Sequence, residues 1–490
     1  VGLESADAVY TFADIARRVR RIRNLLQSRG IDRETRVGVV SPSGTDTILN
    51  LIAVSSCAVC VPLNPRLREA EFRDSLSRLD VALLVPSPLQ SSQVESAARR
   101  LGIPVVSLDE PGPTRGARQD PASSTADIDR RKGIAGETDV AFILRTSGTT
   151  AEPKLVPITH GQILRSAQNI GTVLELAPCD TLLDVMPVHH VHGLSTVCAA
   201  LVSGGRVVCT GDFQADRFFH DLEAFQPTWY SASPTIHHHI LEGLRRRPES
   251  PRTGLRLLRS ASAPMPRKWS KELEARLGVP FVESYGATET AAQVTSNGLS
   301  VDSRKTGSVG RAAGPEVAIV DASGNPVPTN DEGEIVVRGD TVIRAYAGAP
   351  AANLDAFYRE WFRTGDIGHI DEDGFVFIHG RRDDIINRGG EKVSPATVER
   401  VLESHPAVEA AVCFPTPHPV LGQDVGAAVA LKPGAASGRT GGIANEHARE
   451  LERDIRRFAA DRLAGFQVPA RIRFVDAVPG TESGKPDRTD

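Results

Sequence analysis

The chain has 490 residues, of which 40% are hydrophobic and 24% are charged, and its net charge at pH 7 is −4. This length favours two or three compact units of ordinary globular composition. The weak acidity argues against nucleic acid or an anionic membrane as a partner, and no apolar run approaches the roughly 20 residues of an integral membrane segment.

The first 140 residues alternate helical and strand-like patterns. Residues 11–29 have helical spacing, with Thr11 as the N-cap and Gly30 as the stop signal. Further elements are predicted at 36–40 (strand), 45–56 (helix) and 81–85 (strand). Strands that alternate with helices favour a mostly parallel sheet covered by helices.

The alternation continues and then changes character near residue 315. Strands are predicted at 181–186, 206–209, 229–232 and 255–260. Strands at 317–320 and 333–338 flank the turn residues 323–325, which favours an antiparallel, hairpin-rich subdomain. Helices are predicted at 394–402 and 446–463 in the last part of the chain.

These patterns predict an α/β protein with two domains. Residues 1–381 would form a large N-terminal domain of helix-covered, mostly parallel sheets plus a β-rich subdomain. Residues 382–490 would form a small α+β C-terminal domain of ordinary domain size.

The six cysteines are scattered, and two of them, Cys57 and Cys60, form a C-x-x-C pair. A redox role is one interpretation of that spacing. Because the surrounding residues 51–61 are small and apolar, we expect buried structural cysteines instead. Free cysteines favour a reducing compartment, and we expect a cytoplasmic protein, with an organelle as the alternative.

The segment Arg145–Lys154 is the strongest local signal. Hydroxyl residues and glycine follow an apolar run and precede a proline–lysine pair. Hydroxyl groups, bare backbone N–H groups and a cation on one loop suit a polyphosphate, although such a loop is often only a solvated turn. The spacing differs from the G-x-x-x-x-G-K-[ST] loop.

Four further segments carry candidate chemistry: Ser284–Glu289, Phe362–Asp366, Gly380–Lys392 and Ser483–Arg488. In the first, Tyr285 offers a face for stacking a purine, and Glu289 is a hard oxygen ligand suited to Mg²⁺. In the second, Asp366 follows a tight turn, where a carboxylate can bind the hydroxyl pair of a ribose.

The order and spacing of these five segments resemble the adenylate-forming superfamily, which includes acyl-CoA synthetases, adenylation domains of peptide synthetases and beetle luciferases. The resemblance covers essentially the whole chain. It implies ATP-dependent activation of a carboxylic acid to an acyl-adenylate with release of pyrophosphate, then rotation of a mobile C-terminal domain and attack by a thiol with release of AMP. It implies ATP, Mg²⁺ and coenzyme A as cofactors.

The resemblance also implies roles for individual residues. The phosphates of ATP would be bound by Thr146, Ser147, Gly148, Thr149, Thr150 and Lys154. The adenine would be framed by Ala261, Ser262, Ala263, Glu283, Ser284, Tyr285 and Gly286. The α-phosphate would bind Thr288, Mg²⁺ would bind Glu289, and the ribose would bind Asp366 and Arg381.

The C-terminal positions follow in the same way. Lys485 would bridge the substrate carboxylate and the α-phosphate. Asp383 would be the hinge of the C-terminal domain. Arg388, Gly389 and Gly390 resemble the corresponding segment of CoA ligases, so coenzyme A is the favoured acceptor, and a carrier-protein thiol is the alternative. Ala151 and Leu155 stand where the superfamily usually has glycine, a loss of backbone freedom worth about 1 kcal/mol each if a positive φ is required.

The acid site is expected around a histidine cluster. The spacing of His189, His190 and His192 permits a metal site, but no cysteine or carboxylate stands near them in the pattern. The resemblance instead implies an acyl pocket with His190 as its gate. The pocket residues would be His190, Val191, His192, Ser260, Ala287 and Ala292.

Within the superfamily the chain looks most like the oxalyl-CoA synthetase branch of plants and fungi. That branch usually reads T-E-A-T-H where this chain has Thr288–Ala292. The missing imidazole at Ala292 would leave a dianion underpaired, at a cost of several kcal/mol. The sequence therefore favours a larger, less polar monocarboxylic acid, with an oxalate-specific CoA ligase as the alternative.

Overall fold

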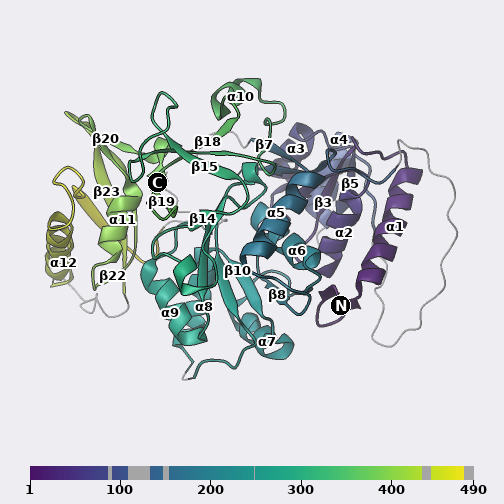
Figure 1. The fold of residues 1–490 in the computed structure, drawn as a ribbon, viewed down its shortest axis with the longest axis horizontal. Helices are drawn as coiled ribbons and strands as arrows, with labels where there is room; N and C mark the ends of the chain where they lie inside the picture. The colour runs from purple at the N-terminus through teal and green to yellow at the C-terminus, as the bar shows by residue number, and fades with distance from the viewer. Residues whose placement is uncertain (87–90, 109–132, 147–153, 248, 433–442, 479–490) are drawn as a thin grey trace. The chain divides into compact units, whose positions relative to one another are not determined.

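The computed structural model of the chain describes residues 1–86, 91–108, 133–146, 154–247, 249–432 and 443–478. The residues separate into two compact units (Figure 1): Val1–Val317 with Val337–Phe362, and Ala318–Val336 with Arg363–Asp490. Five residues with predicted roles lie outside the described residues: Ser147, Gly148, Thr149, Thr150 and Lys485. The domain boundary near Asp383 stays a prediction.

A nine-stranded sheet of the first unit has the order β14-β13-β12-β11-β10-β8-β9-β1-β2. Its central strands run parallel, whereas β2, β13 and β14 pair antiparallel. The strands are β1 (Leu3–Glu4), β2 (Val9–Tyr10), β8 (Thr181–Asp184), β9 (Arg206–Cys209), β10 (Trp229–Ala232), β11 (Leu257–Ser260), β12 (Phe281–Tyr285), β13 (Thr295–Ser296) and β14 (Arg311–Ala312).

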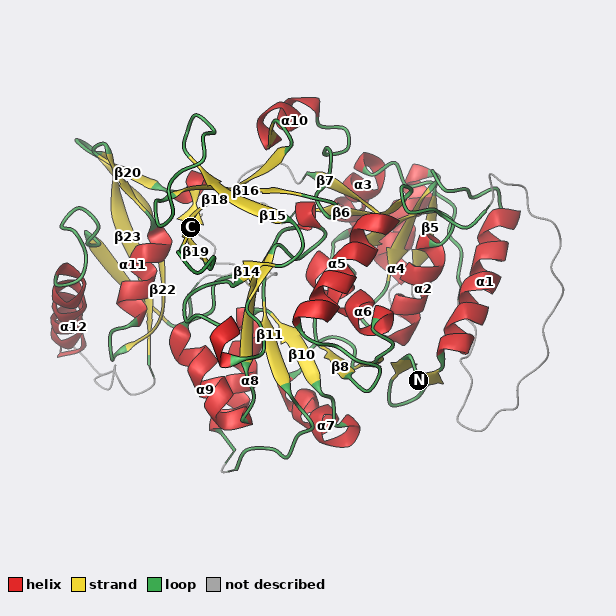
Figure 2. Cartoon of the chain, in the orientation of Figure 1, coloured by secondary structure: helices red, strands yellow, loops and turns green. Residues whose placement is uncertain are grey.

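Helices α7 (Ala215–Phe225), α8 (Pro234–Arg245) and α9 (Arg267–Leu277) lie beside these strands (Figure 2). Between them and the sheet is an apolar core that contains Phe218, Leu241 and Leu273. Burial of such side chains is the main source of stability for a layered α/β unit.

A second sheet of the first unit has the order β5-β3-β4-β6-β7, in which only β7 is antiparallel. The strands are β3 (Arg36–Val40), β4 (Val59–Leu63), β5 (Leu83–Pro86), β6 (Val140–Arg145) and β7 (Leu155–Thr159). The helices around it are α1 (Phe12–Ser28), α2 (Thr45–Ser55), α3 (Glu69–Arg78), α4 (Ser91–Leu101), α5 (His160–Val173) and α6 (Val191–Val202). The strands read as continuous apolar runs because parallel sheets are covered on both faces.

Helix α6 connects the two layers of this unit. It packs against β8 and β9 of the first sheet and against α5, which in turn packs on β7 of the second sheet. Figure 1 shows α5 and α6 side by side. Because α6 packs against both the first sheet and α5, most of its residues are buried, and the majority of them are apolar.

The predicted hairpin-rich region forms a five-stranded sheet. Its strands are β15 (Glu316–Val320), β16 (Gly333–Arg338), β17 (Phe357–Tyr358), β18 (Trp361–Ile370) and β19 (Val376–Arg381), with α10 (Pro350–Ala356) and a one-turn 3₁₀ helix η4 (Val301–Ser303) outside it. Strand β18 pairs antiparallel with both β17 and β19. The turn at 321–325 is closed by the Asp321 side chain, which accepts from the backbone N–H groups of Ser323 and Asn325.

The C-terminal part of the second unit is a sheet with two helices. The strands are β20 (Ile386–Arg388), β21 (Glu391–Val393), β22 (Val408–His418), β23 (Gly422–Leu431) and β24 (Arg471–Val475), and the helices are α11 (Pro395–Glu403) and α12 (Ile443–Ala460). Its apolar core includes Val398, Val425 and Ile455. The α/β architecture predicted from the sequence is confirmed.

Local signals explain where several elements begin. Thr11 caps α1: its hydroxyl accepts from the Asp14 N–H, and the Asp14 carboxylate accepts from the Thr11 N–H.

Cys57 and Cys60 are buried and free, and burial raises the pKa of the Cys57 thiol to about 11, which keeps it in the unreactive protonated form. Among the described helices, none has both the length and the apolar character to cross a membrane.

Candidate active site

The predicted site residues of the first unit gather where parallel strands end. His190 and His192 follow β8, Ser262 follows β11, and Gly286 follows β12. In open α/β sheets, ligands bind in the crevice outside the carboxyl ends of the strands. The topology therefore brings segments far apart in the sequence to one edge of the nine-stranded sheet.

The backbone at this edge is unusual. Ser262, Ala291 and Ala292 have φ values of 82°, 51° and 105°, a region that non-glycine residues seldom adopt. Gly286 is required because a Cβ at that position would overlap the carbonyl oxygen of Ala292. Residues held in such conformations cost roughly 1–3 kcal/mol each and concentrate at ligand sites, so this strain supports the site assignment.

Glu289 lies in the one-turn 3₁₀ helix η3 (Thr288–Thr290), beside Tyr346 and Lys154. The Tyr346 hydroxyl donates to Glu289 Oε1 at 2.8 Å. The Lys154 ammonium lies 4.7 Å from the centre of the Tyr346 ring, a cation–π distance. The Ile343 N–H also donates to the Glu289 carbonyl at 2.9 Å. A carboxylate and a cation are thus held by one tyrosine.

The β6–β7 hairpin positions the start and end of the predicted phosphate loop. The Thr146 N–H donates to the Lys154 carbonyl (3.0 Å), and the Lys154 N–H donates to the Thr146 hydroxyl (3.0 Å). The two described ends of the loop are therefore fixed on a rigid pair of strands. Residues 147–153 between them lie outside the described residues.

A buried chain of polar groups runs behind the edge. His192 Nδ1 lies 2.9 Å from the Ser262 hydroxyl, and His192 Nε2 lies 2.7 Å from the Ser231 hydroxyl. Arg259, on β11, donates to the same Ser231 hydroxyl at 3.0 Å and to the Gln293 side-chain oxygen at 3.4 Å. The chain continues from Gln293, whose amide donates to the Ala313 carbonyl.

Three histidines of this region, His189, His192 and His237, are neutral. Burial lowers the pKa of His189 to about 3 and that of His237 to about 4, and it lowers the pKa of His192 well below its usual value. His190 occupies the N-cap position of α6 without a capping hydrogen bond from its side chain, and the centre of its ring lies 4.3 Å from that of His189. Over the described part of the chain, no three His, Cys, Asp or Glu side chains are grouped to hold a metal.

The remaining nucleotide-framing residues lie on and after β11 and β12. The Ser284 hydroxyl donates to the Ser260 carbonyl (3.2 Å), and the Ala261 N–H donates to the Ala232 carbonyl of β10 (3.3 Å). Burial raises the pKa of the Glu283 carboxyl to about 7. The structure thus brings the segments 260–263 and 283–287 together on neighbouring strands.

The predicted ribose residues belong to the second unit and lie opposite each other. Asp366 on β18 pairs in register with Arg381 on β19, and Arg381 Nε is 3.6 Å from Asp366 Oδ1. Arg381 also donates to the Thr364 carbonyl at 3.1 Å. The arginine therefore holds the carboxylate that follows the Gly365 turn.

The predicted hinge and CoA residues follow β19. Asp383 lies in the one-turn helix η5 (Arg382–Asp384), and its side chain is exposed. Gly389 and Gly390 form the two-residue turn of the β20–β21 hairpin, with φ values of 60° and 99° that favour glycine. Arg388 Nε donates to Asp424 Oδ1 at 2.6 Å, so its guanidinium is held in an ion pair.

Four residues of the site were not found from the sequence: Ser231, Arg259, Gln293 and Tyr346. Arg259 lies within an apolar strand, and the sequence does not indicate which neighbouring strand its side chain contacts. Tyr346 is 57 positions from Glu289, and no spacing rule connects them. A map of which strands are neighbours would have found Ser231 and Arg259, whereas Gln293 lies outside the strands.

The fold and the site edge define an α/β enzyme of the adenylate-forming class. The family described as "AMP-binding enzyme" matches residues 3–347, and "AMP-binding enzyme C-terminal domain" matches residues 397–485. The chain belongs to the AMP-binding enzyme family.

Relatives in plants and bacteria cover nearly the whole chain. A probable CoA ligase of Humulus lupulus is 35% identical, covering 99% of this chain and 91% of its own. An oxalate–CoA ligase of Arabidopsis thaliana is 35% identical (95% and 89%), and a sulfoacetate–CoA ligase of Cupriavidus necator is 31% identical (98% and 91%).

Solved structures agree. ATP-bound MatB from Rhodopseudomonas palustris has a TM-score of 0.86 at 27% identity, covering 99% of this chain and 93% of its own. The O-succinylbenzoate coenzyme A synthetase of Bacillus subtilis with ATP and magnesium has a TM-score of 0.81 at 26% identity (99% and 95%). The chain is an AMP-forming acid–thiol ligase, which activates a carboxylic acid as an acyl-adenylate and then forms the coenzyme A thioester.

Proposed function

We propose that this ligase acts on a small carboxylic acid that carries a second anionic group. The observation that supports this proposal is Arg259, whose side chain is only 3% exposed. Among the described residues its side chain donates to Ser231 and Gln293, which are neutral, and its Nε has no hydrogen-bond partner there. Burial lowers the pKa of the guanidinium to about 10, so it stays charged at neutral pH.

A buried cation without a counter-ion is costly, and the penalty reaches several kcal/mol per ion. An anionic group on the substrate would offset that cost. Arg259 reaches the proposed acid pocket through Ser231, His192 and Ser262, each within 3.0 Å of the next. The neutral His192 can donate a hydrogen bond at one ring nitrogen and accept one at the other. The hydrogen bonds that begin at the Arg259 guanidinium can therefore continue through Ser231 and His192 to Ser262.

This proposal differs from the larger, less polar monocarboxylic acid that the sequence favours because the imidazole at Ala292 is missing. Arg259 supplies a positive charge that the missing imidazole at Ala292 would otherwise provide. Oxalate and sulfoacetate, named in two of the relatives, are both dianions at neutral pH.

On the nucleotide side of the proposed site, Glu289 is the one side chain that would bind Mg²⁺. Glu289 presents one carboxylate held by Tyr346, and Mg²⁺ is commonly bound by one or two carboxylates together with phosphate oxygens and water. ATP supplies the adenylyl group, and Mg²⁺ neutralises phosphate charge when both are bound. Lys154 and Thr146 would hold the outer phosphates, Thr288 the α-phosphate, and Asp366 with Arg381 the ribose.

The test of the acid class is pyrophosphate release across a panel of oxalate, malonate, sulfoacetate, butyrate and octanoate. We expect the dianions to be preferred. In Arg259→Met, kcat/KM for the dianions should fall roughly 100-fold, about 2.7 kcal/mol, with little change for butyrate. Arg259→Lys is the matched control, because it keeps a cation and should retain part of the preference.

Two results would contradict the proposal: a wild-type preference for octanoate, or an equal loss for all acids in Arg259→Met. Thermal unfolding of each variant shows whether the fold is kept. A uniform loss with an unchanged melting temperature would make Arg259 a structural residue.

A further inference from the structure

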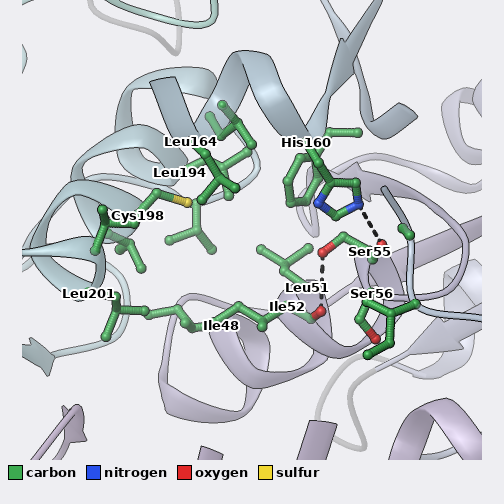
Figure 3. Close-up of a pocket in the computed structure, with 17 residues that line it drawn as sticks. Ile48, Leu51, Ile52, Ser55, Ser56, His160, Leu164, Leu194, Cys198 and Leu201 are labelled. Atoms are coloured by element: carbon green, nitrogen blue, oxygen red, sulfur yellow. Dashed lines mark hydrogen bonds between the residues drawn. The ribbon is translucent and has the colours of Figure 1, made fainter. Parts of the chain in front are cut away.

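A pocket of about 350 Å³ lies among α2, α5 and α6. Figure 3 shows aliphatic side chains from the three helices that point into it, among them Leu51, Ile52, Leu164, Leu194 and Leu201. None of the residues assigned above to ATP, the acid or coenzyme A lines it.

The few polar groups of the pocket are already paired within the protein. The Ser55 and Ser56 hydroxyls donate to the carbonyls of Ile52 (3.1 Å) and Ala53 (2.7 Å). His160 Nε2 lies 2.9 Å from the Ser55 carbonyl (Figure 3), and burial lowers the pKa of His160, which keeps it neutral. Burial raises the pKa of the Cys198 thiol to about 12.

Such a lining holds water poorly. A cavity water needs two to four polar partners, and apolar cavities of about 150 Å³ in other proteins stay dry and bind benzene. No Asp, Glu, Lys or Arg is among the lining residues, so nothing compensates a charge that enters. The pocket therefore favours an occupant that is uncharged and apolar.

The pocket is accessible from solvent. Three of its lining residues, Ile134, Leu164 and Val202, are 69%, 43% and 42% exposed, although they are large and aliphatic. Exposed apolar side chains gathered around one opening mark binding surfaces. The volume is within the range of about 300–1,000 Å³ usual for small-molecule sites.

Helix α6 separates this pocket from the acid site. Leu194, Val197, Cys198 and Leu201 recur at helical spacing and form the pocket face of α6. His192 lies about 200° around the helix from Leu194, where it binds Ser231 and Ser262. The pocket is thus a different site from the one that binds the acid.

We propose that the pocket among α2, α5 and α6 is an accessory binding site for a small, uncharged, apolar molecule. The ligand inserts its hydrocarbon part between Leu51, Leu164 and Leu201, and any hydroxyl group stays at the exposed rim. Binding is driven by removal of apolar surface from water and needs neither ATP nor the acid.

The test is calorimetric titration of the full-length protein with the alcohols 1-butanol to 1-octanol, without ATP, acid or coenzyme A. Saturable binding of one molecule per chain is expected, with an affinity that rises roughly fourfold per methylene, about 0.8 kcal/mol each. Because no substrate is present, the result does not depend on the proposed acid.

Two variants address the pocket itself. Cys198→Phe fills it, and Leu164→Asp places a charge at its rim, so each should weaken 1-octanol binding at least tenfold. Leu354→Asp is the matched control: Leu354 is 82% exposed and lies on α10, outside the lining, and binding should be unchanged.

Three outcomes would overturn the proposal. One is the absence of saturable 1-octanol binding to the wild type. Another is equal binding by the wild type and both pocket variants, with melting temperatures confirming that they are folded. The third is a wild-type dimer in light scattering that Leu164→Asp converts to a monomer, since the face would then be an interface between two copies of the chain.

Discussion

Tyr346 contacts two side chains, Glu289 and Lys154, that are predicted to bind Mg²⁺ and the phosphates of ATP. Its hydroxyl holds the Glu289 carboxylate at 2.8 Å, while its ring lies under the Lys154 ammonium. It is itself buried, so its position is set by packing. A single aromatic side chain therefore separates two opposite charges and fixes the orientation of both.

Removal of the Tyr346 hydroxyl should weaken the response to Mg²⁺. A hydrogen bond to a charged group contributes about 1.5–3 kcal/mol, so in Tyr346→Phe we expect the Mg²⁺ concentration for half-maximal pyrophosphate release to rise at least tenfold. The phenyl ring remains for Lys154, so saturating Mg²⁺ should restore most of the rate.

Tyr358→Phe is the matched control, because it removes a hydroxyl from a tyrosine on β17, outside the site. It should leave the Mg²⁺ dependence unchanged. If Tyr346→Phe has the wild-type Mg²⁺ dependence, Tyr346 does not orient Glu289 for the metal.

Glu289, Lys154, Asp366 and Arg381 are site predictions that rest on local motifs and on the resemblance to the superfamily. The sequence did not indicate Tyr346 or Arg259, because their partners come from other strands and other segments. Arg259 in particular depends on β10 being its neighbour, as shown by the register of Arg259 with Ser231. A local sequence pattern can indicate which residues bind a ligand, whereas the partner of a buried side chain depends on which strands are neighbours in the sheet.

At the scale of an element, strand β8 has an aspartate at each end, and the pKa values of the two are shifted in opposite directions. Asp180 precedes the strand; burial opposes its ionisation, but hydrogen bonds from Arg256, Thr228 and Ala177 lower its pKa. Asp184 ends the strand, and burial raises its pKa to about 7, with one backbone hydrogen bond from Met186 acting against that rise.

The buried Asp184 should make the protein less stable as the pH rises. Its folded pKa is above the unfolded value of about 3.9, so the folded state binds more protons between roughly pH 4 and 7. The free energy of unfolding therefore falls with rising pH across that window and is level above it. Asp184→Asn should remove this contribution and raise the melting temperature at pH 8.

Asp180→Asn tests the opposite sign. The lowered pKa of Asp180 stabilises the fold above the unfolded pKa, and that stability is lost as the pH falls through the folded pKa. This variant should melt lower at pH 8 and approach the wild type in acid. Melting curves of Asp184→Asn from pH 4 to 8 and of Asp180→Asn from pH 2 to 8 check the two signs, because the Asp180 contribution is lost only below about pH 4. A shift of either variant that stays constant over its whole pH range would contradict the prediction.

Element positions were predictable where periodicity and caps agree. The predicted strands at 36–40, 206–209, 229–232 and 333–338 coincide with β3, β9, β10 and β16. Others were predicted too long: the strand at 181–186 ends at Asp184, because the chain leaves the sheet before Met186. The burial of Asp184 could not be predicted, since a charged residue after an apolar run usually marks the surface.

At the scale of the molecule, the resemblance to the superfamily predicts that the chain changes conformation between β19 and β20 during the two-step reaction. Asp383 is the position expected to act as the hinge. It lies in a single 3₁₀ turn. Its exposed carboxylate forms an ion pair with the neighbouring Arg382, in which Asp383 Oδ1 and Arg382 Nε are 3.5 Å apart. A hinge needs a few positions that absorb a backbone rotation without disturbing a core, and this exposed turn meets that need.

Asp383→Pro should separate the two half-reactions. Proline fixes φ near −65°, a value that a 3₁₀ turn already uses, so this conformation stays accessible while rotation about the bond is lost. We expect ATP–pyrophosphate exchange within about twofold of the wild type, because it reports the first half-reaction alone, and a rate of thioester formation at least tenfold lower. Asp383→Ala removes the same carboxylate but leaves φ free, so it should keep both rates. Equal losses of both half-reactions in Asp383→Pro, or the same selective loss in Asp383→Ala, would place the hinge elsewhere in the chain.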